Sequence, residues 1–247
     1  MSGHSKWSTI KRKKGASDAQ RANVFTKIAR EMSVAVKQGG ADPTCNSKLR
    51  DCIAKAKAAN MPNDNIDRCI KKAAGSDDKD NFEELVYEGY GPSGVAVMVE
   101  TLTDNRNRTA GDLRHYFDKF GGNMGQTGCV AFMFERKGVV VIENEDNEID
   151  EDKAFEICLE IGGDDVVMDD EAFMIYCDAS NVGELREALE AMNKYKVLSA
   201  QAEYIPSTET AIEDPDLRVK MSRLLDALEE NDDVQNVWHN WENQDEK

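Results

Sequence analysis

The chain has 247 residues, of which 40% are hydrophobic and 32% charged, a composition typical of folded proteins in aqueous solution. Residues 1–75 contain 16 Lys and Arg but only 6 Asp and Glu, whereas the remaining residues contain 15 Lys and Arg and 42 Asp and Glu. The chain, whose net charge is −17, therefore has a basic N-terminal part followed by an acidic body. The apolar runs are too short for a membrane helix and the N-terminus lacks the apolar segment of a secretory signal, so we expect a cytoplasmic protein without a membrane partner.

The first 20 residues predict a basic, flexible arm, because Trp7 and Ile10 are almost the only residues in it that a core could use. One tryptophan beside clustered cations suits base stacking combined with phosphate neutralisation. The candidate nucleic-acid-binding residues of the arm are Lys6, Trp7, Lys11, Arg12, Lys13 and Lys14. A solvated tail without a ligand is the alternative interpretation.

Residues 21–76 predict a domain of three short helices. The first begins near Asp18 and stops at Gly39 and Gly40, the second follows Asn46 or Ser47, and the third runs from Pro62 and Asn63 to Gly75. Cations fall on the outer faces, including Lys48, Arg50, Lys55 and Lys57 on the second helix. Arg21, Lys27 and Arg30 join the candidate nucleic-acid-binding residues, although a merely solvated surface would show the same pattern.

Residues 81–136 predict an α/β region. Strands are expected at 85–90 and 95–102, a helix capped by Thr109 follows, and a glycine-rich return at 121–128 leads to a strand at 129–135. Arg106 and Arg108 lie just before this helix, where backbone N–H groups and the helix dipole favour anions. They are candidate nucleic-acid contacts, but intramolecular ion pairs would account for them equally well.

The rest of the chain predicts a ferredoxin-like domain at 137–205, because its elements follow the order βαββαβ. The helix and strand expected within 206–241 would complete the layer begun by 81–136, so we predict one discontinuous α/β domain, 81–136 plus 206–241, into which 137–205 is inserted. The expected fold class is α+β with three domains: an N-terminal helical bundle followed by two α/β domains, the last inserted into the middle one.

Signals of catalysis are weak. The segment 121–128 lacks the lysine of a phosphate-binding loop and is interpreted as a flexible turn. The acidic clusters do not match a calcium loop, and the six cysteines form no CxxC pair and are interpreted as small buried side chains. No catalytic residue, metal or cofactor is expected.

Several motifs resemble the YebC family, which includes the mitochondrial translational activator of cytochrome oxidase subunit I. The motifs are Gly3–Trp7, Phe25–Ile28, Gly39–Pro43, Asn60–Pro62, Tyr87–Pro92, Asp104–Thr109 and Gly121–Asn123. The resemblance extends from Met1 to about Glu135 and continues more loosely to the C-terminus. It implies a helical domain followed by two α/β domains and a protein that is not an enzyme. In the arm, Gln20 and Asn23 stand where relatives often have lysine.

The resemblance implies two functions that the sequence separates poorly. Members are widely described as probable DNA-binding transcriptional regulators, and several act in translation on ribosomes that stall at proline-rich stretches. We therefore expect a monomeric, non-enzymatic regulator of gene expression that binds DNA. The alternative is a ribosome-associated translation factor that contacts ribosomal RNA, with its acidic body against basic ribosomal proteins. A third interpretation is an adaptor whose acidic body alone binds basic partners.

Overall fold

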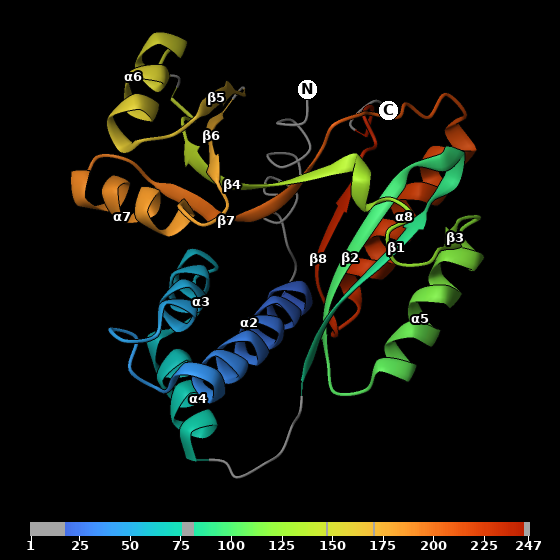
Figure 1. Cartoon of the computed structure of the whole chain (residues 1–247), viewed down its shortest axis with the longest axis horizontal. Coiled ribbons are helices and arrows are strands. Elements are labelled where there is room, and N and C mark those ends of the chain that lie inside the picture. Colours follow the sequence, from blue (N-terminus) through green and yellow to red (C-terminus); the bar gives the residue numbers. More distant parts are fainter. Residues whose placement is uncertain (1–17, 76–81, 147, 170, 245–247) are drawn as a thin grey trace. The chain divides into compact units, whose positions relative to one another are not determined.

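The computed structural model describes residues 18–75, 82–146, 148–169 and 171–244 (Figure 1). Its fold is α+β, as predicted: a helical region comes first, and two α/β parts with one four-stranded sheet each follow. Among the described residues, one compact unit comprises 134–207 and the other comprises 18–75, 82–133 and 208–244. The helical region and the first sheet thus share a unit, and their division into separate domains stays a prediction.

The helical region contains three helices, α2 (Asp18–Gly39), α3 (Ser47–Ala58) and α4 (Asn63–Gly75), at the predicted positions. Apolar residues spaced three or four apart give each helix one buried face. The shared core includes Ile28, Met32, Leu49, Ala56 and Ile66, each at most 4% exposed.

The connection between α2 and α3 is held by Asn46. Its side-chain oxygen accepts a hydrogen bond from the Leu49 amide at 3.0 Å and caps α3, while its amide group donates to the carbonyls of Ala35 and Gly40, both at 2.8 Å. A Cβ atom at Gly39 would lie 2.7 Å from the Asn46 amide nitrogen, so this position requires glycine. The side chain of Asn46 thereby fixes the turn that begins at the end of α2.

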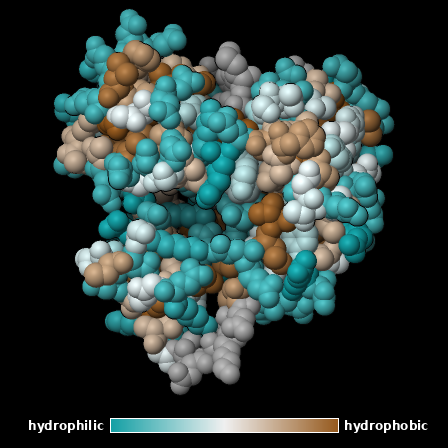
Figure 2. Space-filling view, viewed as in Figure 1, coloured by the Kyte–Doolittle hydropathy of each residue, from teal (hydrophilic) through white to brown (hydrophobic). Residues whose placement is uncertain are grey.

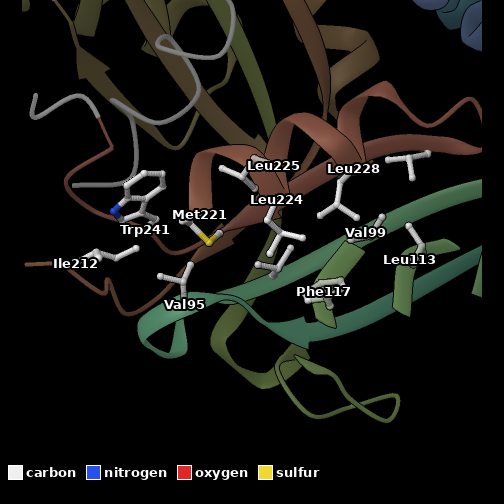
Figure 3. Close-up of a cluster of buried hydrophobic side chains, with 12 residues drawn as sticks. Val95, Val99, Leu113, Phe117, Ile212, Met221, Leu224, Leu225, Leu228 and Trp241 are labelled. Atoms are coloured by element: carbon white, nitrogen blue, oxygen red, sulfur yellow. The ribbon is translucent and has the colours of Figure 1, made fainter. Parts of the chain in front are cut away.

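The first sheet has the strand order β3-β1-β2-β8 and is antiparallel throughout. Its elements are β1 (Glu83–Tyr90), β2 (Ala96–Thr103), α5 (Arg106–Lys119), β3 (Asn123–Met124), α8 (Pro215–Glu230) and β8 (Val234–His239), with a short 3-10 helix η1 (Pro92–Gly94) between β1 and β2. Helices α5 and α8 pack on one face, where Val95 and Val99 meet Phe117 and Leu224 in a buried cluster (Figure 3). The sheet therefore takes one strand and one covering helix from the C-terminal part of the chain.

The second sheet has the order β5-β6-β4-β7, also antiparallel throughout. Its elements are β4 (Phe134–Glu143), α6 (Glu151–Ile161), β5 (Asp165–Met168), β6 (Ala172–Asp178), α7 (Val182–Met192) and β7 (Val197–Pro206). Both helices share a core with one sheet face, in which Ile142, Ile157, Phe173 and Leu189 are at most 1% exposed. The predicted ferredoxin-like order βαββαβ is confirmed.

Two local predictions were wrong. The segment 129–135 is not a strand of the first sheet: residues Ala131–Met133 form a 3-10 helix, η2, and Phe134 begins β4, which pairs with β7. Helix α5 is capped by Asn105, whose side chain accepts a hydrogen bond from the Arg108 amide at 3.1 Å. Thr109, the predicted cap, lies within the first turn of the helix, and its side chain is buried. Both Asn and Thr are good capping residues, so residue type alone did not decide between them.

The prediction that all six cysteines are buried holds for three of them: Cys52, Cys158 and Cys177 are buried, Cys69 and Cys129 are half-buried, and Cys45 is exposed. Burial raises the pKa of the Cys52 thiol to about 12 and that of Cys177 to about 11. These two thiols are protonated at neutral pH and are therefore poor nucleophiles and metal ligands. Within the described residues, no group of three or more His, Cys, Asp or Glu could hold a metal ion, and no helix is long and apolar enough to cross a membrane.

Candidate nucleic-acid interface

The predicted interface is only partly described. Its arm residues Lys6, Trp7, Lys11, Arg12, Lys13 and Lys14 lie outside the described residues, so their role stays a prediction. The other predicted residues are Arg21, Lys27 and Arg30 on α2, and Arg106 and Arg108 at the start of α5. The structure places these five in one unit and gives them different surroundings.

Side chains of α2 cap the C-terminal end of α8. Lys27 donates to the Glu229 carbonyl at 2.6 Å, and Asn23 donates to the Glu230 carbonyl at 2.8 Å. A helix C-terminus carries partial negative charge on unpaired carbonyls, and the last turn of α8 adds carboxylates without a basic residue. Lys27, predicted on an outer face for phosphate binding, therefore already compensates the end of another helix.

A buried carboxylate, Asp233, joins α2 to α5. It is 4% exposed. Its oxygens lie 2.8 Å from the Arg30 guanidinium, 2.7 Å from that of Arg108 and 2.8 Å from the Thr109 hydroxyl. Burial alone would raise the pKa of Asp233, but the hydrogen bonds from Arg108, Thr109 and Arg30 outweigh it and lower the pKa below its ordinary value. We call Asp233, Arg30, Arg108 and Thr109 the Asp233 node.

The stretch 104–109 supplies two members of the Asp233 node, Arg108 and Thr109. Arg108 also pairs with Asp104 at 2.8 Å, four residues earlier, while Asn105 caps the helix that carries it. Arg106 differs: it is exposed, and within the described residues it forms no ion pair. Of the two interpretations for these arginines, intramolecular ion pairing thus describes Arg108, whereas Arg106 has no carboxylate partner within the described residues.

We expect Arg108→Ala to destabilise the protein and Arg106→Ala to leave its stability nearly unchanged. Hydrogen bonds to a charged partner contribute about 1.5 to 3 kcal/mol, and Arg108 is partly exposed, so its loss should cost about 1 to 2 kcal/mol of unfolding free energy. The Arg106 variant should stay within about 0.5 kcal/mol of the original chain. Urea unfolding of both variants measures this, and equal stability would show that the contacts of Arg108 add nothing.

Two further cations of the helical region are also paired. Lys55 was expected on the outer face of α3, but its ammonium lies 2.7 Å from the Glu31 carboxylate of α2. Burial alone would lower the pKa of Lys55, and the charge and hydrogen bond of Glu31 raise it instead. Lys48 pairs with Glu84 of β1. These cations hold elements of the fold together and are less available to phosphates than their spacing indicated.

In the described part of the helical region, residues 18–75, four exposed cations lack a carboxylate partner. They are Lys57, Arg68, Lys71 and Lys72, and within the described residues none of them forms an ion pair. Three of them share one exposed surface of α4 with Asp64 and Asp67. Sequence analysis did not select them as site residues, although the spacing of 68, 71 and 72 places all three on one helix face and could have identified them.

The end of the glycine-rich return and the residues after it are held by a buried carboxylate. Glu88, 3% exposed, accepts hydrogen bonds from the backbone N–H groups of Gly128, Val130 and Ala131 at 2.7 to 2.8 Å. Tyr90 adds a hydrogen bond to the Cys129 carbonyl at 2.9 Å. A conformation held this way differs from the flexible turn that we predicted. A phosphate would need backbone N–H donors of this kind. Because the three N–H groups already donate to Glu88, they do not form a phosphate site.

We expect Glu88→Gln to destabilise this segment, because an amide accepts through one oxygen only and turns its NH2 group toward backbone donors. A buried donor left without a partner costs about 1 to 3 kcal/mol. The measurement is thermal unfolding together with amide hydrogen exchange at Gly128, Val130 and Ala131. Glu83→Gln, an exposed carboxylate on the same strand, is the control. Unchanged protection at the three amides would contradict the proposed function of Glu88 as an anchor.

Family models match almost the whole chain. The model described as "TACO1/YebC protein N-terminal domain" matches residues 5–76, and "TACO1/YebC second and third domain" matches residues 82–241. A solved structure, that of a conserved hypothetical protein from Aquifex aeolicus, is 45% identical with a TM-score of 0.81 and covers 91% of both chains.

Curated relatives are similar over their full length. A protein of Acetivibrio thermocellus is 56% identical over 98% of this chain and 99% of its own. One of Ruminiclostridium cellulolyticum is 55% identical over 100% of this chain and 98% of its own. Both bear the name "Probable transcriptional regulatory protein".

Proposed function

Because the chain belongs to the TACO1/YebC family, we propose that it is a non-enzymatic regulator of gene expression that binds nucleic acid through residues 1–75. The names of its relatives support a regulatory role. The observation that carries the proposal is the charge distribution: residues 1–75 hold ten more cations than anions, in a chain with a net charge of −17. Phosphate binding is the simplest reason to concentrate cations in this way.

We assign two surfaces to this binding. The basic arm is the first, and the exposed cations Arg68, Lys71 and Lys72 on α4 are the second. Lys57 on α3 is a further exposed cation of the helical region. Lys27 and Arg30 contribute less, because helix α8 and Asp233 already bind them. Lysine and arginine neutralise phosphates and carry no sequence information in that contact, so binding should show little sequence preference.

The test is fluorescence anisotropy with a labelled 20-base-pair DNA duplex and the RNA duplex of the same sequence, over a series of salt concentrations. Affinity should fall steeply with salt, and the triple variant R68Q/K71Q/K72Q should reduce the slope for DNA by about 0.9 for each phosphate that it no longer neutralises. A control variant, K194Q/K220Q/R223Q, removes three exposed cations from outside residues 1–75. If the control weakens binding as much as the α4 variant, cations outside residues 1–75 contribute equally, which contradicts the proposed interface.

A further inference from the structure

Helix α6 presents two large apolar side chains to solvent. Its inner face is complete, since Ala154, Ile157 and Cys158 are at most 1% exposed in the core of the second sheet. On the other side Phe155 is 51% exposed and Leu159 is 62% exposed. These two are four residues apart and therefore neighbours on the helix surface. They form an apolar pair that the core of this unit does not use.

Carboxylates surround this apolar pair. Asp152, Glu156 and Glu160 are exposed on the same helix, and Figure 2 shows hydrophobic surface bordered by hydrophilic residues over α6. The one cation of the helix, Lys153, is paired with Glu156 at 2.7 Å. The surface thus combines apolar area with negative charge. We call Asp152, Phe155, Glu156, Leu159 and Glu160 the α6 face.

We propose that the α6 face binds a basic protein segment whose apolar side chains cover Phe155 and Leu159 and whose Lys or Arg residues pair with the carboxylates. The negative charge of the α6 face favours a basic protein segment over other ligands. Phosphates of nucleic acid or of an anionic membrane would meet three carboxylates, and the same face of a second copy would oppose like charges. An amphipathic basic helix or strand supplies both the apolar area and the cations. This surface is separate from the proposed nucleic-acid interface and does not depend on it.

The first test uses a defined probe, a fluorescent helical peptide of leucine and lysine with the sequence LKKLLKLLKKLLKL, added to the full chain. The double variant F155A/L159A should bind it at least tenfold more weakly, and E156Q/E160Q should reduce binding and its salt dependence. Because these side chains are exposed, we expect the variants to keep the circular dichroism spectrum of the original chain. Val219→Ala, which changes a residue 50% exposed on α8, is the matched control. Equal binding by F155A/L159A and V219A would overturn the proposal.

The second test identifies the natural occupant. A photoreactive phenylalanine analogue at position 155, introduced into the full chain in cells, should crosslink to protein segments that are basic and contain apolar residues. The same analogue at position 219 gives the background. Adducts confined to RNA, to lipid or to residues 1–17 of this chain would overturn the proposal of a separate protein partner.

Discussion

Replacing Lys11, Arg12, Lys13 and Lys14 with alanine should weaken binding to every nucleic acid and lower its salt dependence. If each cation neutralises one phosphate of duplex DNA, the variant neutralises four fewer phosphates and its salt slope falls by about 3.6. Between 50 and 200 mM salt the original chain should then lose roughly a hundredfold more affinity than the variant does. Anisotropy titrations of both proteins at these salt concentrations measure the difference.

The matched control keeps the charge of the arm. Exchanging lysine and arginine at the same four positions, K11R/R12K/K13R/K14R, should preserve the slope, because phosphate neutralisation depends on charge. Neither variant should change the melting temperature, since the segment 11–14 contains no apolar residue that a core could use. Unchanged affinity in the alanine variant would show that the arm does not bind nucleic acid.

Replacing Asp233 with alanine should be the most destabilising of the substitutions considered. It leaves Arg30 and Arg108 facing each other without their shared carboxylate. It also removes one of the hydrogen-bond partners of the buried Thr109 hydroxyl, which keeps its contacts with Thr103 and Asn105. Loss of one partner from a buried ion pair costs about 3 to 5 kcal/mol, and since both guanidinium groups reach solvent we expect about 3 kcal/mol. For a chain of this size that lowers the melting temperature by roughly 6 to 12 °C. Thermal unfolding measures it.

The pH dependence of this effect has a defined sign. The pKa of Asp233 is lowered in the folded protein, so its contribution is fully present above the pKa of an unfolded aspartate, about 3.9, and is lost as pH falls through the lower folded value. The stability difference between the original chain and Asp233→Ala should therefore narrow below about pH 4. Asp232→Ala, at a neighbouring exposed residue 4.0 Å from Arg30, should change stability little and is the control. Equal losses from both substitutions would contradict the assigned importance of Asp233.

The fold was predictable where its signals are local. Apolar residues three or four apart, such as Ile28 and Met32, mark one face of a helix, and the order βαββαβ follows from successive short segments. The boundaries of the helices and strands were harder to predict. Residues 129–135 read as a strand by composition. However, Glu88 binds the N–H groups of Val130 and Ala131, and residues 131–133 form a 3-10 helix, so β4 begins only at Phe134.

The candidate site was less predictable, because its decisive contacts join distant segments. Asp233 lies 125 residues from Arg108 and 203 residues from Arg30, and nothing near any of the three in sequence indicates that they meet. The same holds for Lys27 and the end of α8, which are 202 residues apart. The sequence therefore predicted that the outward cations on α2 are free to bind phosphates. The cations of α4, which are exposed and form no ion pair within the described residues, were not among the predicted site residues.

The proposed function requires that residues 1–75 contact nucleic acid in the cell. Ultraviolet crosslinking of the full chain in living cells, followed by identification of both the crosslinked peptides and the attached nucleic acid, measures this contact. We expect crosslinked peptides from the arm and from α4, with the attached sequence showing whether DNA or ribosomal RNA is the working target. Crosslinks confined to residues 134–207, or no crosslinked nucleic acid at all, would contradict the claim.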